Sequence, residues 1–344
     1  MTDSSASSSP TDSPEITRLI VGMPRAATTW LCKTLNGHPD VAAFGETLFW
    51  GRRYIEPDED GGYNDSQLEE IKRHLITGDF LESVLGEGKE CLQNLTWENA
   101  GELVEEVFRG LPERPRPEVV FRALLKGVAR AEGKRFGVEK TQHHLDWVDR
   151  IVKAMPEAKF VVMLREPYGF MLSYKHQGDR KPEQIRQAFR RRYHPLACAI
   201  VWRASMRAAM AAKAAHGENI LWVKHEDIAE SEASVMDQVL AFYQLSPVDL
   251  ADSASRKSGI NSSFPVERAT LQAEDIFWMN LVAGGMMGAG EYEKRKTPFA
   301  PIRILWSLLR LPAWGLWNFF SMRRIVKGSL LVYLWRRINP SRQS

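Results

Sequence analysis

The stretch VGMPRAATTWL, residues 21–31, lies between a short apolar run and a helical pattern, where a phosphate-binding loop would lie. It lacks two defining residues of a nucleoside-triphosphate loop, because Ala27 and Thr28 stand where such a loop has glycine and lysine. Backbone N–H groups at the helix start, the hydroxyls of Thr28 and Thr29 and the charge of Arg25 would still suit an anion. A diphosphate-like group could be neutralised there without magnesium.

Taken alone, this stretch has a simpler interpretation, a strand-to-helix connection in which Thr28 caps the helix and Arg25 is solvated. A second stretch, VVMLREPYGFMLSYKH, favours the anion site. In it a strand ends at Arg165, and a helix then carries Ser173. The planar guanidinium of Arg165 could grip a terminal phosphate, with the hydroxyl of Ser173 closing its far side. The alternative is a structural ion pair for Arg165 and a solvated Ser173.

A parallel sheet would bring these residues together. Short apolar runs alternate with helical patterns, which indicates an α/β fold with a mostly parallel sheet covered on both faces. Ligands of such sheets bind beyond the carboxyl ends of the strands. Four predicted strand ends carry a cation, in the segments MPRAATT, EKTQHH, LREPYG and KHED. The predicted strands cover residues 18–23, 41–44, 135–140, 158–165 and 219–227, and a long, basic helix is predicted at about 184–215.

The 344 residues are enough for one large α/β domain with appendages. We expect a disordered Ser-rich segment at 1–16, a main domain at 17–296 with a helical insert at 56–135 on the acceptor side, and a basic, Trp-rich amphipathic tail at 297–344. The first residues lack the pattern of a signal peptide or anchor, and the cysteines Cys32, Cys91 and Cys198 have no metal-ligand or disulfide spacing. These features predict a cytoplasmic protein.

The loop PRAATTWL resembles the 5'-phosphosulfate loop, PRSGTTWL or PKSGTTWL, of sulfotransferases that use 3'-phosphoadenosine-5'-phosphosulfate (PAPS). The Arg165 and Ser173 pattern resembles their 3'-phosphate motif, and GVEKTQHHL, PEAKFVVMLREP and ILWVKHEDI extend the resemblance over about residues 18–290. The resemblance is to the bacterial and tyrosylprotein branch. It implies a P-loop-like fold, PAPS as donor, no metal, and a sulfuryl transfer to a hydroxyl or amine. The implied donor-binding residues are Pro24, Arg25, Ala26, Ala27, Thr28, Thr29, Trp30, Arg165 and Ser173.

Sulfuryl transfer also needs a base and a cation beside the leaving oxygen. In the resembling branch a Glu in a GE context is the base, which points to Glu46; the cations would be Arg25 and Lys140. His143 or His144 is the alternative base, since cytosolic family members use histidine. Weaker candidates for ligand contacts are Ser262, Ser263, Arg192 and Tyr193.

The chain departs from the family at the loop, where Ala26 and Ala27 replace the usual Ser and Gly, and we expect Ala27 to need a negative φ. The RKGxxG segment of cytosolic members also has no clear counterpart, and GGMMGAGEY resembles instead the closing helix of bacterial members.

The tail sequence has four tryptophans interleaved with Arg and Lys and no acid, which predicts peripheral contact of residues 297–340 with an anionic membrane at its inner face. The alternative is packing on the domain or on another subunit. A net charge of +3 and the apolar content of the tail argue against nucleic acid. The sequence does not decide whether the acceptor is a glycan, a glycolipid, a tyrosine or a small molecule. Two other functions remain possible, a P-loop small-molecule kinase and a non-catalytic nucleotide-binding membrane scaffold.

Overall fold

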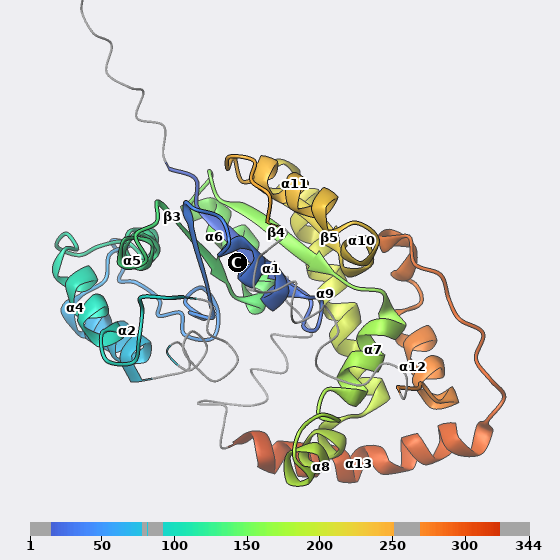
Figure 1. Cartoon of the computed structure of the whole chain (residues 1–344). Coiled ribbons are helices and arrows are strands. Elements are labelled where there is room, and N and C mark those ends of the chain that lie inside the picture. Colours follow the sequence, from blue (N-terminus) through green and yellow to red (C-terminus); the bar gives the residue numbers. More distant parts are fainter. Residues whose placement is uncertain (1–14, 78–80, 82–91, 251–268, 324–344) are drawn as a thin grey trace, which may run out of the picture.

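Five parallel strands form one sheet in the order β2-β3-β1-β4-β5 (Figure 1). The computed structural model describes residues 15–77, 81, 92–250 and 269–323. Strand β1 is buried along its whole length and β4 is buried except at Lys159, which explains their continuous apolar runs. The predicted parallel α/β sheet is therefore confirmed. The strands are β1 Arg18–Gly22, β2 Val41–Gly45, β3 Phe136–Lys140, β4 Lys159–Leu164 and β5 Ile220–Lys224.

Helices flank the sheet, with one group at each of its ends (Figure 1). Helix α5 packs on β2 and β3, and α10 and α11 pack on β5. The helices are α1 Thr28–Leu35, α2 Asp65–Thr77, α4 Ala100–Arg109, α5 Pro117–Ala131, α6 Val148–Ala154, α7 Pro167–His176, α8 Glu183–Arg192, α9 Pro195–Ala215, α10 His225–Glu230, α11 Glu232–Phe242, α12 Ala273–Ala283 and α13 Pro301–Arg323, with 3-10 helices at Gln142–Trp147, Gly217–Asn219 and Met287–Gly290.

Two predicted elements have different limits in the structure. The strand predicted to reach Asp227 ends at Lys224, because the acidic residues that follow it form the first turn of α10, where the helix dipole favours them. The long basic helix predicted near 184–215 is two helices. Pro195 cannot continue a helix, and the His194 side chain caps the new one by accepting a hydrogen bond from Leu196 N.

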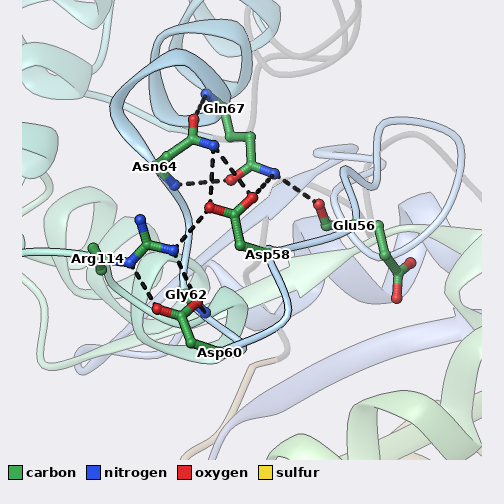
Figure 2. A network of polar contacts seen from close by, with 7 residues as sticks. All are labelled: Glu56, Asp58, Asp60, Gly62, Asn64, Gln67 and Arg114. Carbon is green, nitrogen blue, oxygen red and sulfur yellow. Dashed lines mark hydrogen bonds and ion pairs between the residues drawn. The ribbon is translucent and has the colours of Figure 1, made fainter.

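Arg114 ties two parts of the helical insert together (Figure 2). Its Nη2 donates to Asp58 Oδ2 at 2.8 Å and its Nε donates to Asp60 Oδ2 at 2.7 Å. Hydrogen bonds from Arg114 and from the Gly62 amide lower the pKa of Asp60 to about 2. Asn64 and Asp58 continue this network to the start of α2. The network thus joins the segment before α2 to the turn between α4 and α5.

The first part of the tail forms α13, which runs along α12 and α8. Trp278 Nε1 donates to Ser307 Oγ at 2.8 Å, and His194 Nε2 lies 3.0 Å from the Ser307 carbonyl oxygen. Trp314 Nε1 donates to the Arg192 carbonyl oxygen at 3.2 Å. One face of this segment therefore packs on the domain, as the alternative to membrane contact expected. In the described part of the chain, no helix has the length and apolar character needed to cross a membrane.

Candidate active site

The loop after β1 begins with a glycine that the sheet requires. Gly22 has φ 137°, and a Cβ there would lie 2.3 Å from the Met163 carbonyl oxygen of β4. The neighbouring Met23 N donates to that same oxygen at 2.9 Å. Because the backbones of β1 and β4 approach so closely, only glycine fits at this position.

Two loop residues have left-handed backbone conformations, Arg25 and Ala27, each with φ 65°. The expected negative φ at Ala27 is therefore wrong: the chain keeps the conformation that glycine would adopt and bears the strain of an alanine there. Ala27 is the N-cap of α1, and no side chain caps this helix start. The sequence alternative with Thr28 as the cap does not hold, so ligand oxygens could take the place of a cap.

Residues of the two predicted phosphate motifs meet at the loop. Arg25 Nε donates to Ser173 Oγ at 3.1 Å, and Arg165 Nη1 donates to the Arg25 carbonyl oxygen at 2.7 Å. Their strands, β1 and β4, are neighbours, which explains the convergence. Burial, together with the charge of Arg25, lowers the pKa of Arg165 to about 10, and burial also lowers that of Arg25. Both guanidiniums remain charged at neutral pH, in a buried place where an anion would be stabilising.

The remaining loop residues differ in exposure. Thr28 is buried and its Oγ1 accepts a hydrogen bond from Gln142 Nε2 at 3.0 Å, whereas Thr29 is exposed. Trp30 and Ala26 are buried, and Pro24 is half-buried.

The predicted base and cation form an ion pair. Lys140 Nζ donates to Glu46 Oε1 at 2.8 Å, across the carboxyl ends of the adjacent strands β3 and β2. Burial alone would lower the pKa of Lys140, but Glu46 and other nearby groups outweigh it, so the pKa is raised. Gly45 leaves room for the present position of Lys140, since a Cβ there would lie 2.8 Å from Lys140 Cε. A carboxylate and an ammonium group are thus held together beside the loop.

Comparison with known proteins identifies the family. A sequence model of the sulfotransferase family matches residues 19–249. The chain belongs to the sulfotransferase family. The resemblance of its motifs is thereby confirmed, and with it an enzyme that transfers sulfate.

No curated protein sequence matches the chain. The chain is similar to solved sulfotransferase structures at low identity. The sulfotransferase domain of a Synechococcus olefin synthase is 18% identical, with a TM-score of 0.45 over 78% of this chain and 95% of that one. The domain from the curacin biosynthetic pathway is 14% identical, with a TM-score of 0.48 over 81% and 98%. The sulfotransferase STF9 from Mycobacterium avium is 11% identical, with a TM-score of 0.45 over 83% and 80%.

In this sulfotransferase His144 is part of a buried network. Its Nδ1 lies 3.1 Å from Glu139 Oε2, and its Nε2 accepts a hydrogen bond from Trp50 N at 3.2 Å. Glu139 Oε1 accepts hydrogen bonds from Thr47 N and Thr47 Oγ1, both at 2.9 Å, and from Thr141 Oγ1. Because His144 Nε2 is already an acceptor and the ring is fully buried, the geometry argues against it as the base.

The other candidates lie elsewhere. His143 lines a small hollow together with Gly22 and Pro24 of the loop. Tyr193 donates its hydroxyl to Asp275 Oδ1 at 2.7 Å, and Lys224, the cation at the end of β5, pairs with Glu291. Ser262 and Ser263 lie outside the described residues.

Three residues that position others in the site were not predicted from the sequence. Gln142 bonds to Thr28, Gly45 leaves room for Lys140, and Glu139 accepts from Thr47. Their positions beside the motif residues of the EKTQ and GE segments were the available signal. Nothing in those segments shows which side chains are fully buried.

Proposed function

We propose that this sulfotransferase moves a sulfuryl group from PAPS to a hydroxyl or amine of its acceptor. The observation that carries the proposal is the convergence of Arg25, Ser173 and Arg165 beside the uncapped start of α1. A phosphosulfate and a terminal phosphate are the anions that such a pair of adjacent sites suits.

The donor would be held by two groups of residues. The amides of the loop, Arg25 and the threonines would bind the 5'-phosphosulfate, because successive N–H groups in a loop with left-handed residues turn toward one side. Arg165 and Ser173 would bind the 3'-phosphate. The Ser173 oxygen already accepts from Arg25, so its hydroxyl hydrogen remains to be donated to the phosphate. The proposed site needs no metal, since Arg25 and Lys140 supply the cations.

The transfer step would use the ion pair at the end of β2 and β3. Glu46 takes the proton of the acceptor hydroxyl or amine as the acceptor atom bonds to sulfur. The bond between sulfur and the 5'-phosphate oxygen breaks, and that oxygen keeps the electron pair. Lys140 and Arg25 stabilise the negative charge that develops on it. Lys140 is already hydrogen-bonded to Glu46. A small movement of its ammonium group would therefore let it contact both Glu46 and the leaving oxygen.

The acceptor would approach from the side of the helical insert, because α5 packs on β2, which Glu46 follows, and on β3, which ends at Lys140. A glycan, a glycolipid or another membrane-proximal molecule fits the second part of the proposal, that residues 297–340 contact an anionic membrane at its inner face. The described part of this segment, α13, supports that contact with a row of exposed apolar side chains. A screen of acceptors with labelled PAPS would identify the substrate class.

Calorimetry with adenosine 3',5'-bisphosphate (PAP) tests the donor assignment. We expect the full chain to bind PAP, and Arg165→Ala to weaken binding by roughly tenfold or more, since a charged hydrogen bond to phosphate is lost. Arg130→Ala, an exposed arginine that pairs with Glu106, is the control and should bind as the wild type does. Equal binding by the Arg165 variant would refute the assignment. Turnover of ATP with magnesium in place of PAP binding would favour a kinase, and PAP binding with no turnover of any acceptor would favour a scaffold.

A further inference from the structure

A hollow of about 480 Å³ lies between the end of α8 and the middle of α13. Its lining includes three arginines, three aromatic residues and no acidic residue. The arginines are Arg190, Arg191 and Arg310, and the aromatic residues are Tyr193, Trp314 and Trp317. A cavity of this size with aromatic walls and several cations suits a ligand that joins an anionic group to an apolar body.

Among the described residues, the charges around the hollow are compensated only in part, by the ion pair of Arg190 with Asp179. Helix α8 ends in Arg190, Arg191 and Arg192, has no buried side chain, and meets Arg310 of α13 at the hollow. Asp179 approaches Arg190 only to 3.4 Å, and the Arg190 side chain is 60% exposed. Cations at a helix carboxyl end are favourable for one helix, but several guanidiniums gathered around one hollow repel one another. A bound anion would remove that repulsion.

The exposed face of α13 continues from the hollow. Ile302, Trp306, Leu309, Leu316 and Phe320 follow one another at intervals of three, four and seven residues, so they form one apolar stripe. Their exposed fractions run from 59% to 83%. This stripe lies opposite Ser307, which is buried against the domain.

Arginine borders this stripe. Arg303 and Arg310 follow Ile302 and Leu309 in the chain and are seven residues apart, so they lie along the same edge of it. An apolar stripe with arginines and tryptophans at its edge is the pattern of helices that lie in the headgroup region of an anionic bilayer.

We propose that the hollow between α8 and α13 binds the phosphate of an anionic phospholipid headgroup, while the α13 stripe lies against the acyl chains. The inference rests on the membrane contact in the proposed function and deepens it. A free phosphate would not use the apolar stripe, and the arginine edge matches the negative charge of a lipid surface. Helix α7, which carries Ser173, contacts α8 and α12, and both of these contact α13. The lipid surface would therefore lie on the donor side of the molecule (Figure 1).

Vesicle co-sedimentation of the full chain tests the proposal. We expect binding to vesicles of phosphatidylglycerol and phosphatidylcholine, and little binding to phosphatidylcholine alone. The double variant Arg191→Gln, Arg310→Gln should have an affinity for the anionic vesicles that is lower by roughly tenfold or more. The control Arg73→Gln, Arg130→Gln removes two exposed arginines from the helical insert and should bind as the wild type does. Leu309→Ser tests the stripe separately and should also weaken binding.

Several results would overturn the proposal: no binding of the wild type, equal binding to both kinds of vesicle, or equal binding by the double variant. Release of the protein by millimolar inorganic phosphate at constant ionic strength would show that free phosphate is the ligand instead. PAP calorimetry on the same samples keeps the two proposals apart, because intact PAP binding with absent vesicle binding overturns only the lipid site. Circular dichroism of each variant shows whether it is folded.

Discussion

At the scale of single residues, the proposed base and its proposed cation partner form an ion pair in the structure without a substrate. Glu46 and Lys140 are bonded at 2.8 Å, and Gly45 leaves room for the lysine stem to pass. The Glu46 side chain is 28% exposed and the Lys140 side chain 9%, so an acceptor would reach Glu46 while Lys140 stays buried beside it. A buried cation next to a reachable carboxylate is an arrangement suited to proton transfer with charge compensation.

Replacing Glu46 by Gln keeps the shape of the side chain and removes the base. We expect kcat to fall by a factor of about 10² to 10⁴, because proton transfer in the transition state is lost. PAP affinity should change by no more than about twofold. Kinetics with the identified acceptor and calorimetry measure the two effects, with the exposed Glu113→Gln as control. If His143→Ala produced the fall in kcat and the Glu46 variant did not, the base assignment would be wrong.

Ala27 stores backbone strain in the donor loop. Its φ of 65° costs a residue with a Cβ about 1–2 kcal/mol. Ala27→Gly should relieve that strain, whereas Ala26→Gly, at a neighbouring loop residue without positive φ, adds only the flexibility of glycine. The free energy of unfolding in urea should therefore be higher for Ala27→Gly than for Ala26→Gly by about 1–2 kcal/mol. Equal values for the two variants would show that the loop relaxes around alanine.

At the scale of elements, the segment after β2 is positioned by the end of β3. Glu139 holds Thr47, and His144 holds Trp50, so two of the four residues after Glu46 are bonded to one buried pair. Hydrogen bonds and the nearby imidazole outweigh the effect of burial and lower the pKa of Glu139. Since its folded-state pKa is depressed, its stabilising effect is present above the unfolded value of about 4.3 and is lost as the pH falls through the folded value.

Glu139→Gln should remove that pH dependence. At pH 7 the variant should be less stable than the wild type, by up to about 3–5 kcal/mol, because a buried charge partner of His144 is lost. The two should approach each other as the pH falls through the lowered folded-state pKa of the wild-type carboxyl, where it becomes protonated. Urea unfolding at a series of pH values measures this. The exposed Glu113→Gln is the control, for which the curve of unfolding free energy against pH should run parallel to that of the wild type. A parallel curve for Glu139→Gln would mean that the Glu139 carboxylate contributes no pH-dependent stability.

The elements were predictable from sequence to different degrees. The strand, loop and helix around Arg25, and the strand and helix that carry Arg165 and Ser173, follow from local apolar patterns and turn residues. The role of His144 was not predictable, because full burial and a bond to Trp50 N arise only from long-range packing. The left-handed Ala27 was mispredicted for a similar reason: local preference disfavours that conformation, and the bond from Arg165 to the Arg25 carbonyl helps to impose the loop shape.

At the scale of the whole molecule, the strand order divides the site. The order β2-β3-β1-β4-β5 places Glu46 and Lys140 on one side of the donor loop and Arg165 with Ser173 on the other. Apolar runs predicted the strands but not their neighbours, since strand order depends on contacts between distant segments. The tail likewise has two faces: one bonds to the domain through Ser307 and Trp314, and the other is exposed.

Ligand binding should stabilise the whole molecule, because the site draws on residues of β1, β4 and α7. PAP at about 100 times its Kd adds about 2.7 kcal/mol to the free energy of unfolding. For a domain of this size we expect Tm to rise by about 4–5 °C. Adenosine 5'-monophosphate at the same concentration, which lacks the 3'-phosphate, should give a much smaller rise. Equal shifts with the two ligands in a thermal scan would contradict the role given to Arg165 and Ser173.

The strand order also bears on the sequence of binding events. Because the groups proposed for the acceptor lie at the ends of β2 and β3, and those for the 3'-phosphate at the end of β4, the two substrates would occupy separate places on either side of β1. Neither substrate needs to leave before the other binds. The sulfuryl group would pass directly from donor to acceptor, without a covalent intermediate on the protein. The arrangement thus favours a sequential kinetic mechanism, with intersecting double-reciprocal plots in place of the parallel lines of a ping-pong enzyme.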